Sequence, residues 1–458
     1  MIRRVLIANR GEIARRVIRT CHAMNIETVA VYSEVDHDAP HVREATSAVA
    51  IGPAAASESY LNIPALIDAV RKSGADAVHP GYGFLSENAA FAEACEAAGV
   101  IFIGPPGAVI RRMGSKTGTR ALMAAAGVPI VPGVAPKAQD DDSIAAAVRE
   151  VGFPALLKAA GGGGGKGMRV VRAESEIADA IGAARRESQR AFGNPALYVE
   201  RLVERPRHIE IQIFADNYGH TVHVLERECS LQRRHQKVIE EAPAPRIAPR
   251  VRERIRTAAI AAARAVEYVN AGTCEFLLEG EGDQARFYFL EMNTRLQVEH
   301  PVTEAVTGLD LVRAQIVVAN DQPLPFTQQD VVARGHAIEC RVYAEDPRTL
   351  LPQSGRLLRY VEPEGDGIRI DGGVREGQMI TVHYDPLIAK AIAHGNTREI
   401  ARERLIGALG GFLILGLRHN VALLATLLAL PEFVASTAYT TLMEERGAAL
   451  LPPASSEA

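Results

Sequence analysis

Cysteine is scarce in this sequence of 458 residues. None of its five cysteines forms a CxxC pair or the spacing of a metal-binding finger, so the sequence argues against a zinc module and a disulfide framework. We expect reduced, buried thiols in a cytoplasmic protein. The five are Cys21, Cys95, Cys229, Cys274 and Cys340.

Long apolar runs are also missing. The longest candidate, from Val421 to Leu430, stops at Pro431 and is shorter than the ~18 apolar residues that a membrane span needs. The opening residues, MIRRVLIANRGE, have only a short apolar stretch before Asn9 and do not resemble a signal peptide. We therefore expect a soluble protein without a membrane partner.

Neither sign of charge dominates the composition. There are 51 Lys and Arg residues against 55 Asp and Glu residues, a formal net charge of −4, which gives no reason to expect nucleic acid or a charged membrane as partner. A local basic run, QRRHQK, extends from Gln232 to Lys237 and contains no aromatic residue. A small polyanionic substrate explains this run better than a nucleic acid or a solvated basic surface.

Alternating strand and helix patterns fill roughly the first 110 residues. The apolar segment RVLIAN is followed by the helical pattern GEIARRVIRTCHAM, and similar alternation continues to VIFIGP. This order predicts a parallel sheet covered by helices. Gly11 alone does not make the three-glycine fingerprint of a dinucleotide site, so we expect a Rossmann-like region without a nicotinamide site.

The pattern changes from about Gly114, and the chain length suggests roughly three domains. A compact unit around a glycine-rich loop comes first, and antiparallel strands follow in HIEIQIFAD, TVHVLERE and FYFLEMN. From about Arg334 a third region has strand patterns in GHAIECRVYAED and RLLRYVEPEG and ends in two helices. The last residues, LLPPASSEA, are typical of a linker.

The glycine run Gly161–Gly165, followed by Lys166 and Gly167, is the clearest local signal. Glycine lets a backbone approach phosphate oxygens closely. It is not a Walker loop, because Lys166 precedes glycine rather than Ser or Thr and the flanks predict strand, loop, strand. A flexible hairpin is the alternative, but Lys158 on the preceding strand favours a nucleotide site.

Two later segments alternate apolar and polar residues. In RHIEIQIFAD, the polar set His208, Glu210 and Gln212 lies on one face of a strand, although a solvated face would give the same pattern. In FLEMNTRLQVEHP every second residue is polar, in the order acid, amide, cation, amide and acid. Such a row suits neither an apolar core nor an ordinary surface. Its residues are Glu291, Asn293, Arg295, Gln297 and Glu299.

A carboxylate pair is predicted beside that row. Glu275 lies on the preceding strand, where it could face Glu291. Two carboxylates and an amide oxygen form a hard oxygen site suited to Mg²⁺, which prefers few protein ligands together with phosphate oxygens. Structural ion pairing is the alternative explanation of the row.

Together these segments resemble the biotin carboxylase family over nearly the whole chain. The segments are IANRGEIA, HPGYGFLSEN, KAAGGGGGKGMRVV, RHIEIQ, QRRHQKVIEEAPAP, EMNTRLQVEHPVTE and RGHAIECRVYAEDP, in the family's order. The resemblance implies an α/β and α+β fold in three parts. These are a Rossmann-like pre-ATP-grasp domain (1–113), an ATP-grasp domain (114–333) with a mobile glycine-rich lid at about 131–203, and a C-terminal biotin carboxylase domain (334–446), followed by a tail (447–458).

The resemblance also assigns roles to individual residues. ATP contacts are Lys116, Lys158, Gly164, Gly165, His208, Gln232, His235, Glu275, Glu291 and the hinge Glu200, Arg201, Leu202 and Val203. Magnesium ligands are Glu275, Glu291 and Asn293. The bicarbonate and biotin pocket comprises Lys237, Arg295, Gln297, Val298, Tyr82 and Arg341, with Glu299 as general base and Lys237, Arg295 and Arg341 as further catalytic residues.

The implied reaction is the ATP-dependent carboxylation of biotin by bicarbonate, a ligase reaction that passes through carboxyphosphate. Its cofactors are ATP and Mg²⁺, which Mn²⁺ can replace, with biotin as a carrier-bound substrate. The implied partners are a biotin carboxyl carrier protein or domain and a carboxyltransferase, and a homodimer is one expected assembly. The reaction would be the first half of an acetyl-, propionyl- or methylcrotonyl-CoA carboxylase.

Alternatives and departures accompany the resemblance. Another ATP-grasp ligase would share the phosphate residues but not the RLQVEH and HQKVIEEAP pockets, and a degenerate scaffold subunit would have lost a site residue. No methionine precedes a lysine, so the carrier's Met-Lys-Met signature is absent from these residues. Leu-Arg-His-Asn at 417–420 replaces the family's usual Thr-Asn turn, and Arg246 stands where glycine is common. We expect neither departure to touch a site residue.

Overall fold

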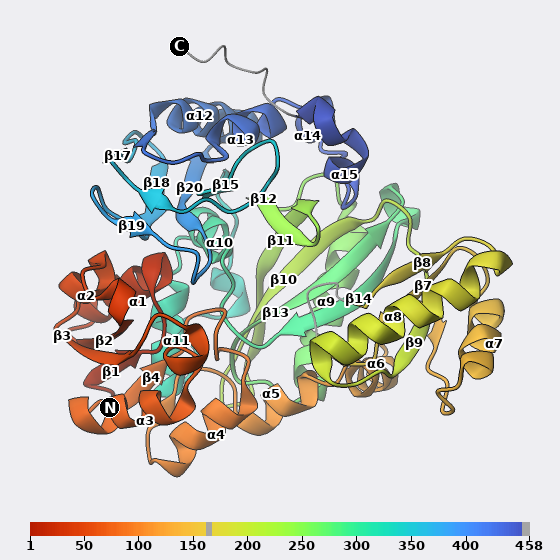
Figure 1. Ribbon diagram of the computed structural model, residues 1–458, viewed down its shortest axis with the longest axis horizontal. Helices are drawn as coiled ribbons and strands as arrows, with labels where there is room; N and C mark the ends of the chain where they lie inside the picture. The colour runs from red at the N-terminus through yellow and green to blue at the C-terminus, as the bar shows by residue number, and fades with distance from the viewer. Residues whose placement is uncertain (162–166, 451–458) are drawn as a thin grey trace.

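The first region of the chain is a parallel sheet with helices on both faces (red and orange in Figure 1). The computed structural model describes residues 1–161 and 167–450, with the backbone but not the side chain of Lys116 and Ala448. The elements of this region are β1 (Arg4–Ile7), α1 (Gly11–Ala23), β2 (Glu27–Ser33), α2 (Pro40–Glu44), β3 (Ser47–Gly52), α3 (Ile63–Ser73), β4 (Ala77–His79), α4 (Ala89–Ala97), β5 (Ile101–Phe102) and α5 (Gly107–Met113).

The strand pairings confirm the predicted parallel sheet. The order is β3-β2-β1-β4-β5, and every pair is parallel. Val5 and Ile7 pack in one apolar cluster with α1, whereas Leu6 packs in another with α3, because successive side chains of a strand point to opposite faces.

The lid is a small four-stranded unit with its own apolar core, drawn in yellow at the right of Figure 1. After α6 (Lys116–Ala125) it contains β6 (Gly133–Val134), α7 (Asp141–Val151), β7 (Ala155–Ala159), β8 (Arg169–Val171), α8 (Ile177–Phe192) and β9 (Leu197–Arg201). Its strand order is β6-β9-β7-β8, and β7 pairs antiparallel with β8. The predicted strand–loop–strand arrangement is thus confirmed on both sides of the glycine run.

An antiparallel sheet of eight strands forms the centre of the molecule. Its elements are β10 (Arg207–Ala215), β11 (Thr221–Arg233), β12 (Gln236–Ala242), β13 (Asn270–Glu279), β14 (Arg286–Asn293), β15 (His336–Tyr343), β18 (Ile368–Gly372) and β20 (Leu387–Gly395), with helices α9 (Pro249–Ala265), α10 (His300–Thr307) and α11 (Leu311–Ala319). The order β14-β13-β10-β11-β12-β15-β20-β18 carries the sheet past residue 333 into the third region without a break.

The third region packs its remaining strands and helices against β15 and β20 (blue in Figure 1). They are β16 (Gly355–Arg356), β17 (Arg359–Val361), β19 (Met379–Ile380), α12 (Arg398–Gly411), β21 (Leu413–Leu415), α13 (Val421–Leu428), α14 (Pro431–Val434) and α15 (Leu442–Arg446). In the segment 417–420, the Asn420 amide donates to the Arg341 carbonyl oxygen at 3.0 Å. Asparagine also ends the family's usual Thr-Asn turn, so this contact does not come from the departure.

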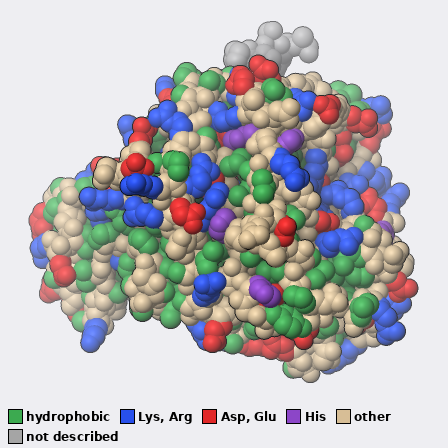
Figure 2. All heavy atoms as spheres, turned by 180° about the vertical axis from the view of Figure 1, so that it is seen from behind, with side chains coloured by type: hydrophobic (Ala, Val, Ile, Leu, Met, Phe, Trp, Pro, Cys, Tyr) green, Lys and Arg blue, Asp and Glu red, His purple; other side chains and the backbone are tan. Residues whose placement is uncertain are grey.

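Surface and composition agree with the sequence-based expectations. All five cysteines are buried and free of disulfides. On the face seen in Figure 2, acidic and basic side chains are interspersed, as the near balance of charges predicts. Within residues 1–161 and 167–450, no helix combines the length and apolarity that crossing a membrane requires.

Candidate active site

A cavity of about 810 Å³ lies between the lid, the central sheet and the turn after β11. Most of the predicted site residues line it, although they come from segments spread over nearly two hundred positions. They are Lys158, Glu200, His208, Gln232, His235, Lys237, Glu275, Glu291, Asn293, Arg295, Gln297, Val298, Glu299 and Arg341. The predictions for Gly164, Gly165 and the Lys116 side chain fall outside the described residues.

The two faces of β10 explain why its polar residues belong to this site. Ile209, Ile211 and Ile213 pack in an apolar cluster with α9. His208 and Glu210 therefore point to the opposite face, where Glu275 is the cross-strand neighbour of Glu210. The polar face is buried in the site rather than solvated, which settles the alternative left by the sequence.

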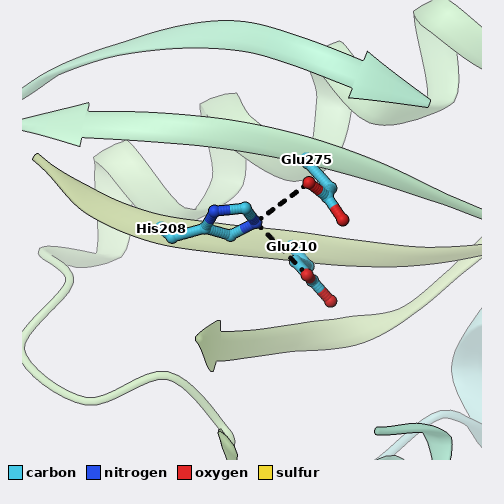
Figure 3. Close-up of side chains that lie close together, drawn as sticks. All are labelled: His208, Glu210 and Glu275. Carbon is cyan, nitrogen blue, oxygen red and sulfur yellow. Dashed lines mark ion pairs between the residues drawn. The ribbon is translucent and has the colours of Figure 1, made fainter. Parts of the chain in front are cut away.

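His208 joins the carboxylates of this face, as Figure 3 shows. Its Nε2 lies 3.2 Å from Glu210 Oε1 and 3.1 Å from Glu275 Oε2. Its Nδ1 lies 2.9 Å from the side-chain amide nitrogen of Gln232. The ring is thus held from both sides, with one nitrogen directed at two acids.

Lys237 is the cation on which three carboxylates converge. Its ammonium group donates to Glu275 Oε1 at 2.9 Å, to Glu299 Oε1 at 2.6 Å and to Glu210. Burial lowers the pKa of this amine, but the charges of Glu275 and Glu299 outweigh it and leave the pKa above its ordinary value. Lys237 therefore stays charged and offers a fixed anion-binding group.

Glu299 lies between two cations. Arg341 Nη2 is 3.0 Å from Glu299 Oε2, opposite the Lys237 contact. Burial raises the pKa of Glu299, but Lys237 and Arg341 outweigh that effect and hold the pKa well below its usual range. The carboxylate is consequently ionised.

The row from Glu291 to Glu299 is extended over only part of its length. Strand β14 ends at Asn293, and a turn leads to α10, which has Pro301 in its first turn. The side chains still converge, because Arg295 Nη2 donates to Asn293 Oδ1 at 3.1 Å and Gln297 Nε2 donates to Glu275 Oε1 at 2.9 Å. The alternation therefore identifies the right residues although the regular strand stops midway.

The residues expected to bind magnesium meet at the paired strands β13 and β14. Glu275 and Glu291 are directly opposite each other, as predicted. The Asn293 amide nitrogen donates to Glu275 Oε1 at 2.7 Å, and the Asn293 oxygen accepts from Arg295 at 3.1 Å. Two carboxylates and an amide oxygen fit a hard divalent cation such as Mg²⁺.

The lid side of the cavity suits a nucleotide. Lys158 Nζ lies 2.5 Å from Glu200 Oε2, and Arg120 Nη1 lies 2.5 Å from Glu200 Oε1. Lys158 is buried and Arg120 is half-buried, and an apolar wall lines the same cavity. The wall consists of Ile130, Phe289, Leu290 and Met292.

Four predicted residues do not line the cavity. Arg201 pairs with Glu279 at 2.8 Å, Leu202 donates its backbone N–H to Pro154, and Val203 packs in a small apolar cluster. Tyr82 donates its hydroxyl to Glu12, and its ring lies 5.8 Å from the ammonium of Lys390. Lys390 in turn donates to the Val298 carbonyl oxygen at 2.9 Å, so Tyr82 lies one residue away from the predicted pocket.

Besides Arg120, three further residues of the site were not predicted. Glu210 was noted only as part of the alternation, and Glu87 binds Arg295 at 2.9 Å from the N-terminal region. Arg227 is fully buried and donates to Glu210 at 3.1 Å and to Gln297. The alternation could have identified Glu210, but Arg227 lies in an ordinary strand sequence, ERECS, that carries no local signal.

Comparison with known proteins places this architecture in a family. Residues 1–110 match the family "Biotin carboxylase, N-terminal domain", residues 115–327 match "Carbamoyl-phosphate synthase L chain, ATP binding domain", and residues 339–445 match "Biotin carboxylase C-terminal domain". Biotin carboxylase 2 of Bacillus subtilis is 49% identical over 433 residues, which cover 94% of this chain and 97% of that protein. This chain belongs to the biotin carboxylase family.

Other biotin carboxylase relatives extend the comparison. The mitochondrial methylcrotonoyl-CoA carboxylase subunit alpha of Mus musculus is 48% identical over 453 residues, 98% of this chain but only 63% of that protein. The chain thus spans less than two thirds of that relative. The biotin carboxylase of Campylobacter jejuni, whose structure is described as a β,γ-ATP complex, has a TM-score of 0.93 and 41% identity, and the match covers 97% of this chain and 99% of that one.

A second solved structure has the same fold. It is the biotin carboxylase domain dimer of the Hydrogenobacter thermophilus 2-oxoglutarate carboxylase, described as a complex with MgADP, ADP and bicarbonate. It has a TM-score of 0.93 and 42% identity, and the match covers 98% of this chain and 99% of that one.

Proposed function

We propose that this chain carboxylates biotin, using MgATP and bicarbonate. The observation that carries the proposal is the ionised Glu299, held between Lys237 and Arg341 at a cavity that Glu275, Glu291 and Asn293 also line. The two cations can bind an anion, and the carboxylate between them can take its proton. Membership in the biotin carboxylase family supports the same reaction.

Bicarbonate would enter beside Lys237 and Arg295, with Gln297 and Val298 as further contacts. Fixing this weak nucleophile lowers the entropic cost of the reaction. Bicarbonate would also share the Lys237 ammonium with Glu299. That exchange weakens one of the interactions that depress the pKa of Glu299, so its proton affinity rises when the substrate arrives.

The first chemical step would transfer a phosphoryl group. Glu299 takes the bicarbonate proton, a bicarbonate oxygen attacks the γ-phosphorus, and the bond to the β-phosphate oxygen breaks, giving carboxyphosphate and ADP. Lys158 and His208 would contact the phosphates, with Lys116 and the glycine loop as further expected contacts. Glu275, Glu291 and Asn293 would hold Mg²⁺, which supplies neutralisation of phosphate charge.

The second step would carboxylate biotin. Carboxyphosphate breaks down to CO₂ and phosphate, and the phosphate takes the proton from the ureido nitrogen. The nitrogen then attacks CO₂, while Arg341 stabilises the negative charge on the ureido oxygen. Closure of the lid through the hinge Glu200–Val203 would keep water away from carboxyphosphate.

The assembly around this reaction is also a proposal. The 48% identity with methylcrotonoyl-CoA carboxylase subunit alpha over 453 residues favours a role in an acyl-CoA carboxylase. Its partners would be a biotinylated carrier and a carboxyltransferase. The dimer described for the Hydrogenobacter thermophilus domain supports a homodimer. We propose domain boundaries near residues 113 and 333, with the central sheet continuing across the second one.

The decisive experiment measures ADP release by the chain with Mg²⁺ and bicarbonate, with and without free biotin. We expect a bicarbonate-dependent rate that biotin increases. In Glu299→Gln the biotin-dependent rate should fall by a factor of about 10²–10⁴, the usual contribution of a general base, while ATP still binds. The exposed Glu364→Gln serves as the matched control. Turnover of Glu299→Gln at the rate of that control would eliminate Glu299 as the base.

A further inference from the structure

Behind the cavity, two buried glutamates face each other across the sheet. Glu240 of β12 and Glu339 of β15 are directly opposite in the antiparallel pairing. Both are fully buried. Like charges directly opposite each other on a sheet destabilise it, so two ionised carboxylates at this position would be costly.

The hydrogen bonds of the two glutamates are unequal. Glu240 Oε1 accepts from Arg341 Nε at 2.6 Å. By contrast, Glu240 Oε2 and both carboxyl oxygens of Glu339 have no hydrogen-bond donor among residues 1–161 and 167–450. A buried carboxylate without donors is unstable, whereas a protonated carboxyl group can donate to a neighbouring carboxylate.

The charged groups around Glu240 and Glu339 favour a single negative charge on the two carboxyl groups together. Lys390, which is opposite Arg341 in the sheet, and Arg341 itself lie on the same face as Glu339. Glu299 adds a negative charge beside Arg341. The helix α10 contributes His300, whose pKa burial holds well below its usual value, so that this side chain is neutral.

Burial and the neighbouring acids act on both glutamates in the same direction. Burial, the largest effect, raises the pKa of Glu339 well above its ordinary value, and Lys390 opposes it only partly. Burial also raises the pKa of Glu240, and Arg341 opposes this. Glu240 is the better site for the negative charge, because its carboxylate is paired with the Arg341 guanidinium.

We propose that Glu240 and Glu339 share one proton and act as a positioning pair for Arg341, with Glu240 the ionised member and Glu339 the protonated one. Glu240 fixes the Nε edge of the guanidinium, and Glu299 holds the Nη2 group. Because Glu339 is neutral, it does not offset the positive charge that Arg341 would present to the ureido oxygen. The proposal rests on the function proposed above.

Infrared difference spectroscopy tests the shared proton without turnover. We expect the spectrum of wild type minus Glu339→Gln at neutral pH to contain the carbonyl stretch of a protonated carboxyl group. Lack of that band would overturn the proposal. Because this measurement needs no substrate, it can fail while ADP release still supports biotin carboxylation, and the reverse also holds.

Kinetics tests the positioning role. Glutamine at 240 removes the negative charge beside Arg341, so Glu240→Gln should lower the biotin-dependent rate by about tenfold to a hundredfold, the cost of a charged hydrogen bond. The same variant should lower the slower ADP release without biotin by a smaller factor. A merely structural role would lower both rates equally, and that result would overturn the proposal.

Glu339→Gln is the matched variant, because glutamine reproduces a neutral side chain of the same size. Its biotin-dependent rate should fall by less than that of Glu240→Gln, and Glu240→Asp should recover part of the lost rate. Equal losses in the two glutamine variants would show that both carboxyl groups are ionised and would contradict the shared proton. Thermal unfolding of each variant establishes that the compared proteins are folded.

Discussion

Arg227 illustrates how a residue that touches no substrate can determine the geometry of a site. Its guanidinium is fully buried and binds Glu210, Gln212, Thr303 and Gln297 at once. The bond to Gln297 fixes the orientation of that amide, so that its N–H group points to Glu275. Arginine suits this position because its planar fork presents donors in fixed directions.

The substitution Arg227→Lys keeps the positive charge but removes the planar guanidinium and its several donors. We expect the bicarbonate-dependent rate to fall by about tenfold to a hundredfold, since charged hydrogen bonds of about 1.5–3 kcal/mol are lost. KM for bicarbonate should rise more than KM for ATP, because Gln297 belongs to the proposed bicarbonate pocket. The exposed Arg250→Lys is the control. An equal rise of both KM values would contradict this positioning role.

At the scale of the element, β10 separates stability from chemistry by its two faces. The isoleucine face packs under α9, and the polar face forms the floor of the site. A strand with one face in an apolar core and one in an active site tolerates different substitutions at neighbouring positions.

The substitution Ile211→Ala tests this separation. Removing a fully buried isoleucine should lower the free energy of unfolding by about 2–5 kcal/mol, because the transfer free energy is lost and a cavity remains. KM values for ATP and bicarbonate should stay close to wild type. Urea unfolding measures the first effect, with the exposed Val382→Ala as control. A large change in KM would show that the two faces are not independent.

Much of this arrangement was predictable from residue order. Alternation in RHIEIQIFAD and FLEMNTRLQVEHP identified the polar faces, because a period of two places side chains on one side of a strand. Arg227 and Glu87 were not predictable, since their roles arise from contacts between distant segments. The opposition of Glu240 and Glu339 likewise depends on the pairing of β12 with β15, which local sequence does not encode.

At the scale of the whole molecule, the first and third regions meet at an interface that buries an ion pair. Glu12 of α1 lies 3.2 Å from Lys390 of β20. Burial raises the pKa of Glu12 to about 7, and the positive charge of Lys390 opposes this only in part. The folded protein therefore holds this proton in a pH range where the unfolded chain releases it.

The sign of the pH dependence follows from that difference. Since the folded state binds the extra proton, Glu12 lowers the free energy of unfolding as pH rises from about 4.5 to about 7, by at most about 3 kcal/mol. By urea unfolding, the change in free energy of unfolding from pH 4.5 to pH 7 should be more positive in Glu12→Gln than in wild type or Glu364→Gln. Identical slopes in all three proteins would show that Glu12 does not titrate in this range.

The continuous sheet has a consequence for the timing of the two proposed steps. Lys237 lies on β12 and Arg341 on β15, and these strands are hydrogen-bonded neighbours, about 4.8 Å apart. The cation beside which carboxyphosphate would form and the cation that would face biotin thus belong to one rigid lattice of backbone hydrogen bonds. Closure of the proposed lid would leave their separation unchanged. Both cations contact the same Glu299 carboxylate, so a short-lived intermediate released at the first would already lie beside the second, and its survival would depend on proximity and not on transport.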